Sequence, residues 1–254
     1  MSQSIWTQCA GASSLRAFEG DAWRVVENQQ LIGTRKLVDS ELEHELLERL
    51  IDGAKPGPRR EPEFDGVHYL LATSFRYPPL RYGSRFGVRA ARGLWYGSEE
   101  IRVALAEVAY YRLLFLEGTK ADIAPLMVEL TAFQARLRTD RAADLTVAPF
   151  VDAAEAISSP TQYEPAQQLG ADMRSDGVVL FRYASARDAQ GGVCIGLFSP
   201  LAFARKQPFN FKLWHCVVDR RGVELSRKDF IEKASFSFPR EQFLVGGELP
   251  SPAT

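Results

Sequence analysis

The order of helix-like and strand-like segments is the feature that most constrains the fold of this chain. Strand-type patterns, rich in apolar and β-branched residues, occur at residues 22–28, 69–73, 145–150, 178–183, 193–198, 209–218 and 222–225. Helix-type patterns occur at residues 40–51, 97–116 and 123–137. The two kinds are mixed and do not repeat as regular strand–helix–strand units. This order predicts an α+β fold of mixed strands with flanking helices rather than a doubly wound parallel sheet.

A chain of 254 residues is long enough for one large domain or two small ones. The segment AKPGPRREPEFDG, at residues 54–66, is rich in proline, glycine and charge, so it is the best candidate linker. We therefore predict three parts: an N-terminal extension at 1–66, a main domain at 67–232 and a C-terminal tail at 233–254. The extension contains a helix at 40–51, where Ser40 and Glu43 have the spacing of a capping box.

The charge and the cysteines exclude several classes of protein. The net charge of −1 argues against binding nucleic acid by phosphate neutralisation. Cys9, Cys194 and Cys216 form no CxxC pair, so a disulfide framework or a zinc site is not expected. No stretch approaches the roughly 18 uninterrupted apolar residues of a membrane helix, and no signal-peptide pattern is found. We predict a cytoplasmic protein that binds neither membranes nor nucleic acid directly.

Common catalytic motifs are missing from the sequence. His44, His68 and His215 are the histidines of the chain, and none stands in HExxH or another ligand spacing, so no metal is expected. There is no GxSxG, no GxxxxGK followed by Ser or Thr, and no GxGxxG that opens a helix after a strand. These absences disfavour a serine hydrolase, a P-loop enzyme and a Rossmann dehydrogenase.

Glu107 is an unusual acid in the middle of the helix predicted at 97–116. Its neighbours at helical spacing are apolar or aromatic, and no Lys or Arg lies three or four residues away. Burying a carboxylate on such a face is costly unless a group outside the helix satisfies it. Perturbed charges of this kind are over-represented at functional sites. The alternative is that Glu107 points to solvent at the helix edge. Ser98 is the candidate cap of this helix.

The loop before this helix could supply a cationic partner. Residues 75–87 (FRYPPLRYGSRFG) place Arg85 beside glycines that let backbone amides approach an anion, and arginine binds phosphate oxygens bidentately. Tyr96, at a strand end, could stack on a flat cationic ring. A packed surface turn with arginine–aromatic stacking explains the loop equally well. Ser185, which follows a strand, is by itself an ordinary loop hydroxyl.

Four segments together resemble the RES family, which is named for Arg, Glu and Ser positions. They are GSRFG, GLWYGSEEIRVALAEVAYYR, SPTQY and DGVVLFRYASARDAQGGVCIGLF. Arg85, Tyr96 and Glu107 follow one another at steps of eleven residues, and Ser185 comes just after a strand. Arg24, in AWRVVENQ, matches an arginine near the family's N-terminus. Many short members have GGRWN in place of GSRFG, so this chain resembles a longer branch with an extra helix before the core.

The resemblance implies a fold similar to that of ADP-ribosyltransferases and the activity of an NAD-consuming toxin from an Xre–RES toxin–antitoxin pair. It implies cleavage of the nicotinamide–ribose bond of NAD, by hydrolysis or phosphorolysis, which depletes NAD and arrests growth. The implied partner is an Xre-type helix–turn–helix antitoxin that occludes the pocket. One alternative is an ADP-ribosyltransferase that modifies a cellular protein. A second is a catalytically inactive RES-fold binding domain.

The same resemblance assigns a role to each site residue, with NAD as substrate and no metal. Glu107 stabilises the positive charge that develops on the ribose, as in glycoside cleavage. Arg85, helped by Arg24, holds ribose or diphosphate oxygens. Tyr96 stacks on nicotinamide or fixes its ribose, and Ser185 hydrogen-bonds the nicotinamide end. We therefore expect these side chains to line one pocket.

Overall fold

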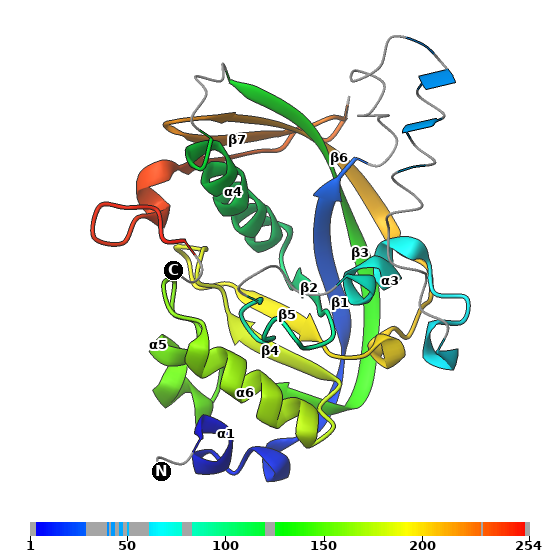
Figure 1. The fold of residues 1–254 in the computed structure, drawn as a ribbon, viewed down its shortest axis with the longest axis vertical. Coiled ribbons are helices and arrows are strands. Elements are labelled where there is room, and N and C mark those ends of the chain that lie inside the picture. Colours follow the sequence, from blue (N-terminus) through cyan, green and yellow to red (C-terminus); the bar gives the residue numbers. More distant parts are fainter. Residues whose placement is uncertain are drawn as a thin grey trace.

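The computed structural model describes residues 4–28, 61–77, 83–119, 125–229 and 231–251, together with residues 40, 42, 43, 46, 47 and 50. The architecture is α+β, as predicted (Figure 1). The strands of the described residues form one eight-stranded sheet in the order β1-β2-β5-β4-β3-β6-β7-β8. Neighbouring strands are antiparallel, except that β3 and β4 are parallel.

The strands are β1 (Arg16–Glu27), β2 (Trp95–Ser98), β3 (Leu126–Asp144), β4 (Leu180–Ala184), β5 (Val193–Leu197), β6 (Phe209–Asp219), β7 (Gly222–Arg227) and β8 (Ser235–Pro239). The α-helices of the described residues are α1 (Ile5–Gln8), α3 (Tyr69–Arg76), α4 (Ile101–Glu117), α5 (Ala154–Ile157) and α6 (Glu164–Ser175). Short 3₁₀ helices occur at Gly11–Ser14, Pro62–Phe64, Phe150–Ala153, Pro200–Ala202 and Arg240–Phe243.

The long strand β3 joins the two halves of the sheet. β1 lies along β3 as an antiparallel partner. The first half of β3 also pairs with β6, and the last residues of β3 pair with β4. β1 pairs in addition with β2, at Trp23 and Ser98. The strands β1, β2, β5, β4 and β3 therefore close a ring, from which β6, β7 and β8 extend. Figure 1 shows β1 in blue and β3 in green running together through the molecule.

Helix α4 packs on the half of the sheet that contains β1, β6 and β7. Leu105, Ala109 and Leu113 recur at helical spacing, are fully buried, and share a core cluster with Trp214 and Leu225 of the sheet. Complete burial of each leucine side chain contributes about 1.5–3 kcal/mol to stability. This packing fixes α4 along its length and so gives the side chains between these positions defined directions.

Helix α6 covers the other half of the sheet. Leu169 and Met173 pack in a second core cluster with Phe181 of β4. Gly170 has no side chain where the loop before β2 crosses the helix, and a Cβ there would lie 2.1 Å from the carbonyl oxygen of Phe86. The absence of a side chain at this one position therefore lets the loop lie directly against α6.

Most predicted elements are confirmed: β1, β4, β5, the β6–β7 hairpin and α4 lie where their sequence patterns occur. The predicted cap of α4 is wrong. The residue before the helix is Glu100, which makes no side-chain capping bond. Ser98 instead belongs to β2, where it pairs with Cys194 of β5.

Residues 69–73, predicted as a strand, belong to helix α3. His68 Nδ1 accepts a hydrogen bond from the backbone N of Leu70 at the start of the helix, at 3.2 Å. Leu71 and Phe75 are both buried and stand four residues apart. That spacing places them on one face of a helix, whereas a short apolar run by itself does not distinguish a helix from a strand.

The predicted helix at 123–137 is also wrong, because residues 126–137 are the first part of β3, while residues 123 and 124 lie outside the described residues. The buried positions Leu130 and Ala132 alternate as in a strand, but the buried phase then shifts to Phe133, Ala135 and Leu137. The pairing with β6 has an irregularity at this point. A bulge of this kind breaks the two-residue period. Pairing with β1 on one side and β6 on the other overrides the local helical preference.

The predicted strand at 145–150 is replaced by a turn. The Asp144 carboxylate accepts hydrogen bonds from the backbone N of Thr146, at 3.0 Å, and from its hydroxyl, at 2.6 Å. This local bonding offers the backbone an alternative to sheet pairing, so β3 ends at Asp144. A 3₁₀ helix begins at Phe150.

Much of the predicted N-terminal helix at 40–51 lies outside the described residues. Within it, the reciprocal bonds of a capping box are present: Ser40 N donates to Glu43 Oε2 at 3.1 Å, and Glu43 N donates to Ser40 Oγ at 3.2 Å. The domain boundaries stay predictions, and the sheet includes β1 from before residue 66 and β8 from after residue 232. No helix in the described part of the chain has the length and apolar character needed to cross a membrane.

Candidate active site

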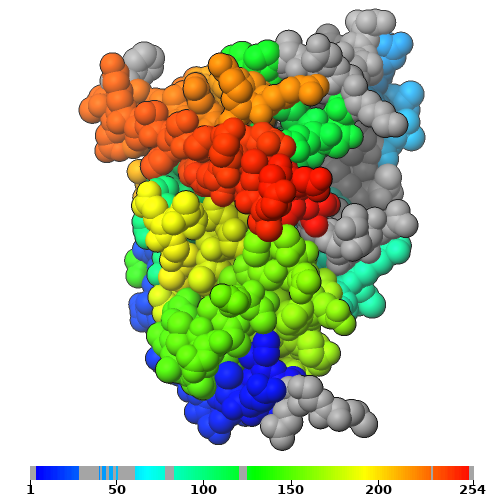
Figure 2. Space-filling view, turned by 90° about the vertical axis from the view of Figure 1, so that its left-hand side faces the viewer, coloured from blue at the N-terminus to red at the C-terminus, as the bar shows by residue number. Residues whose placement is uncertain are grey.

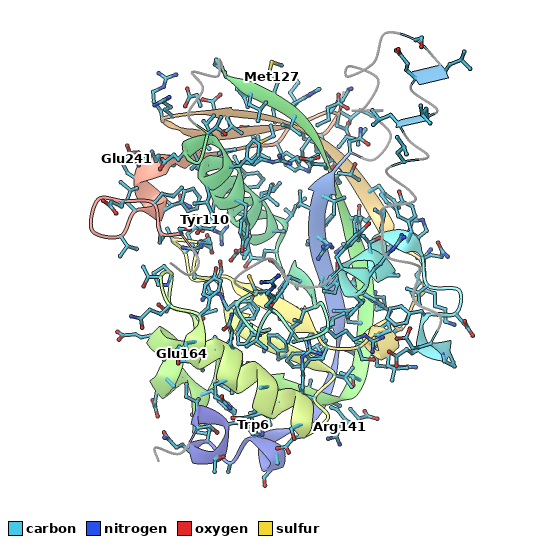
Figure 3. The ribbon with its side chains drawn as sticks, in the orientation of Figure 1. Trp6, Tyr110, Met127, Arg141, Glu164 and Glu241 are labelled. Carbon is cyan, nitrogen blue, oxygen red and sulfur yellow. The ribbon has the colours of Figure 1, made fainter. Side chains whose placement is uncertain are left out.

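A cavity of about 260 Å³ lies where α4, β1, β2 and the loops beside α6 meet. Its lining includes Arg24, Arg85, Tyr96, Glu107, Tyr111 and Tyr163. In Figure 3, Tyr110 marks α4 and Glu164 marks the start of α6, and the chain neighbours of these two labelled residues both line the cavity. The cavity therefore gathers side chains from segments far apart in the sequence.

Glu107 lies in the middle of α4 and lines the cavity. Its Oε1 atom accepts a hydrogen bond from Ser185 Oγ at 2.6 Å, and the Cys194 thiol lies 3.6 Å from the same atom. Among the described residues, no hydrogen bond reaches its Oε2 atom and no cation lies within ion-pair distance. One carboxylate oxygen is thus held by neutral donors, and the other has no protein partner among the described residues.

Ser185 does not line the cavity but lies behind Glu107. It follows β4, and its Oγ accepts hydrogen bonds from the backbone N of Arg187 and of Asp188, each at 3.1 Å. Because two donors point at this oxygen, its own proton is directed to Glu107. The carboxylate of Asp188 in turn pairs with Arg102, which fixes the loop to α4. The geometry therefore connects Ser185 to the carboxylate rather than to the cavity surface.

Arg85 reaches the cavity from the loop before β2 and is 8% exposed. Its Nη1 donates to the carbonyl oxygen of Ser159 at 2.6 Å, and its guanidinium carbon lies 4.6 Å from the centre of the Tyr163 ring. Burial disfavours the charged guanidinium, but Tyr163, Tyr183 and Glu107 nearby outweigh burial, so the pKa of Arg85 is raised. The group is a permanent cation on an aromatic face.

Tyr96 holds the loop that carries Arg85. Its hydroxyl oxygen accepts a hydrogen bond from the backbone N of Phe86 at 3.2 Å and lies 2.9 Å from the Ser84 hydroxyl. Burial raises the pKa of Tyr96 to about 12, so the hydroxyl stays protonated at neutral pH. The tyrosine therefore joins β2 to the loop as well as lining the cavity.

Arg24 enters the cavity from β1. Its Nη1 donates to the carbonyl oxygen of Tyr96 at 2.6 Å, and its guanidinium carbon lies 5.5 Å from the centre of the Trp95 ring. Its Nε atom is buried and has no hydrogen-bond partner in the described structure. Burial lowers the pKa of Arg24 to about 10, so the group remains a cation at neutral pH. An unpaired donor of this kind is costly unless a ligand supplies an acceptor.

Sequence reasoning named four of these lining residues but missed others. Tyr163 stands in the segment SPTQY, which carried part of the family resemblance, and Tyr111 is one turn beyond Glu107 on α4. Both could have been proposed from those positions. Cys194 was considered only as a possible metal ligand or disulfide, and its contact with Glu107 depends on the pairing of strands.

The cavity suits a particular kind of ligand. It contains two guanidinium groups, one carboxylate and several tyrosine rings, and no histidine is among its lining residues. Guanidinium groups bind phosphate oxygens, and tyrosine rings stack on flat rings. A carboxylate stabilises positive charge that develops beside it. The fold and site thus define an α+β protein whose cavity combines two guanidinium groups, a carboxylate and aromatic rings.

Comparison with known proteins shows the family to which this chain belongs. The model of the RES domain matches residues 59–219, which is more than half of the chain. The chain therefore belongs to the RES domain family, as the sequence motifs predicted. Arg24 lies outside the matched residues.

The fold is also similar to a chain in the crystal structure of the M. tuberculosis MbcT–MbcA toxin–antitoxin complex. The TM-score is 0.47 at 12% sequence identity, over 82% of this chain and 91% of that chain. No curated protein matches the chain.

Proposed function

We propose that this RES-domain protein cleaves the nicotinamide–ribose bond of NAD. The observation that carries the proposal is the state of Glu107, whose Oε1 is held by Ser185 while its Oε2 has no described protein partner. A carboxylate kept in this way can act on a ligand rather than on a structural cation. The family membership supports the same choice, because the family resemblance implies NAD as substrate.

The reaction places positive charge next to this carboxylate. The bond between ribose C1′ and the pyridinium nitrogen breaks, and its electron pair stays on nicotinamide, which leaves as a neutral molecule. The ribose passes through an oxocarbenium-like state that Glu107 stabilises. An acceptor oxygen then bonds to C1′. When the acceptor is water, its proton is released to solvent. A neutral leaving group needs no separate acid, which agrees with a lining that contains no histidine.

The remaining lining residues bind the two ends of the dinucleotide. Arg85 and Arg24 hold diphosphate or ribose oxygens, and the Nε of Arg24 has no other described acceptor. The rings of Tyr163 and Tyr111 offer flat surfaces for nicotinamide or adenine. Tyr96 acts mainly by keeping the Arg85 loop in place, and Ser185 acts through Glu107.

The acceptor is identified by mixing purified protein with NAD, with and without phosphate. NAD loss in both cases indicates hydrolysis, and loss only with phosphate indicates phosphorolysis. Loss that requires cell extract indicates transfer of ADP-ribose to a protein, which is the alternative function. NAD that stays intact in every mixture would leave an inactive binding domain and would contradict the proposal.

Glu107→Gln tests the role of the carboxylate. The change keeps the size of the side chain, so we expect unfolding free energy within about 1–2 kcal/mol of wild type. It removes the charge that faces the ribosyl cation, and loss of one such contact lowers the rate about 100- to 1,000-fold. NAD should still bind. Glu155→Gln, on the exposed surface of α5, is the matched control and should behave as wild type. A Glu107→Gln variant with wild-type turnover would show that Glu107 is a structural acid.

We further propose that the protein is a toxin controlled by an antitoxin of the Xre helix–turn–helix type. Expression of the wild-type chain alone should arrest growth and lower cellular NAD, and co-expression of the antitoxin should restore both. The Glu107→Gln variant, expressed alone at the same level, should neither arrest growth nor lower cellular NAD. Growth arrest with unchanged NAD would instead favour modification of a cellular protein.

A further inference from the structure

The Glu107 carboxylate has a second neighbour besides Ser185. Cys194 lines the cavity, and its Sγ lies 3.6 Å from Glu107 Oε1, the same oxygen that Ser185 contacts. Both neighbours act on one oxygen, so Oε2 is the atom left to face a ligand. Nothing in the proposed function assigns a part to this thiol.

The pairing of two strands determines where Cys194 lies. β2 and β5 are antiparallel neighbours, and their register places Ser98 opposite Cys194. Ser98 Oγ lies 3.5 Å from Cys194 Sγ, and both side chains are almost completely buried. The three groups therefore form a chain that runs from Ser98 through Cys194 to Glu107.

The protons of this chain have one consistent arrangement. Burial, reinforced by the negative charge of Glu107, raises the pKa of the Cys194 thiol, so the sulfur keeps its proton at neutral pH. A carboxylate can only accept hydrogen bonds, so the thiol proton points to Glu107 Oε1. The sulfur is then free to accept from the Ser98 hydroxyl. Each group in the chain thus donates toward the carboxylate.

We propose that Ser98 and Cys194 form a buried donor chain that positions Glu107 for NAD cleavage. The proposal rests on the proposed function. Cys194 is a positioning residue: together with Ser185 it holds Oε1 in place. Oε2 is thereby directed at the ribose. The thiol forms no covalent bond with the substrate.

Two substitutions at one position separate hydrogen bonding from packing. Cys194→Ala removes the donor, and Cys194→Ser keeps a donor in a slightly smaller side chain. A thiol is a weak donor, so its loss should lower kcat about three- to tenfold, below the effect of a strong charged hydrogen bond. KM should stay within about twofold, because Arg85 and Arg24 remain. Cys194→Ser should keep kcat within about threefold of wild type.

Rescue by the conservative variant gives a readout that packing alone does not change. Cys194→Ala, which loses the donor, should lose turnover at an unchanged KM, and Cys194→Ser, which keeps a donor, should recover it. Ser185→Ala, which removes the shorter bond to the same oxygen, should lower kcat further, again at an unchanged KM.

The outcomes distinguish this proposal from the function on which it rests. If Glu107→Gln retains full activity, the catalytic assignment of Glu107 fails, and the donor chain then has no catalytic carboxylate to position. If Glu107→Gln is inactive but Cys194→Ala has wild-type kcat, the donor chain is refuted and the function stands. Equal losses in Cys194→Ala and Cys194→Ser, with equal falls in melting temperature, would also refute it, because packing would then explain the effect.

Discussion

Arg24 is a charged residue of the cavity with a buried donor that lacks a described partner. One of its nitrogens donates to the Tyr96 carbonyl, while its Nε is buried without a described acceptor. A hydrogen bond to a charged group is worth about 1.5–3 kcal/mol. Arg24→Met should therefore raise the KM for NAD about 10- to 100-fold and change kcat much less.

The matched control for Arg24 is on the same strand. Arg16→Met removes an arginine of β1 that is half exposed and lies 3.8 Å from Asp144. It should leave KM unchanged, because Arg16 is not part of the cavity lining. A collapse of kcat in Arg24→Met at constant KM would mean that Arg24 acts through the position of Tyr96 rather than on the substrate.

The sequence could identify part of the site residue by residue. Glu107 was recognisable because a mid-helix acid without a local cation needs a partner from elsewhere, and the structure supplies Ser185. The sequence pattern could not show which group each side chain contacts. Ser185 was expected to bond the nicotinamide end of NAD, and in the structure its hydroxyl donates to Glu107 Oε1. Cys194 reaches Glu107 only through the β2–β5 register, which a sequence pattern does not specify.

At the scale of elements, Gly170 decides how closely the Arg85 loop approaches α6. Glycine inside a helix costs about 1 kcal/mol relative to alanine, so Gly170→Ala would stabilise an isolated helix. Here the new Cβ would meet Phe86 O at 2.1 Å. Overpacking costs about 1–3 kcal/mol, so after the gain in helix propensity we expect net destabilisation of up to about 2 kcal/mol. Displacement of the loop should also raise KM for NAD several-fold.

A second variant on the same helix separates the loop from helix stability. Ala171→Gly changes the exposed neighbour of Gly170 and lowers helix propensity by about 1 kcal/mol without touching the loop. It should match the stability loss of Gly170→Ala but keep the wild-type KM. Equal KM values in the two variants would show that α6 does not position the Arg85 loop.

Elements were predictable where one local pattern agreed with the tertiary contacts. α4 and the β6–β7 hairpin have strong periodicity or turn signals, and they form as expected. β3 was mistaken for a helix because its bulge near Phe133 hides the two-residue period, and its hydrogen bonds come from two distant strands. Such non-local pairing leaves no trace in a short window of sequence.

At the scale of the whole molecule, the C-terminal segment, residues 235–251, belongs to the same hydrophobic core as the α4 residues beside the site. Figure 2 shows it, in orange-red and red, lying against yellow and green segments. The Tyr110 hydroxyl donates to the Pro250 carbonyl, and Gln242 Nε2 donates to Arg187 O at 3.2 Å. The guanidinium of Arg187 lies 3.6 Å from the centre of the Tyr110 ring. The matched RES segment ends before these contacts, at residue 219.

Phe243 is one of the side chains through which the C-terminal segment packs into the core. It is 3% exposed, and its ring lies 6.1 Å from that of Tyr110. Phe243→Ala should lower the free energy of unfolding by about 3–5 kcal/mol, the usual cost of emptying a buried aromatic site. Phe211→Ala, at a position that is 53% exposed, is the control and should cost less than about 1 kcal/mol.

Hydrogen exchange would show whether the loss of stability in Phe243→Ala also loosens the backbone at the site. The backbone amides of Arg187 and Asp188 donate to Ser185 Oγ, which in turn donates to Glu107. Loosening Tyr110 should free Arg187 and speed exchange at these two amides in Phe243→Ala, but not in Phe211→Ala. Turnover should fall in parallel at temperatures where the variant is still folded. Unchanged protection at both amides, despite the lower stability, would mean that the C-terminal segment stabilises the fold without controlling the carboxylate.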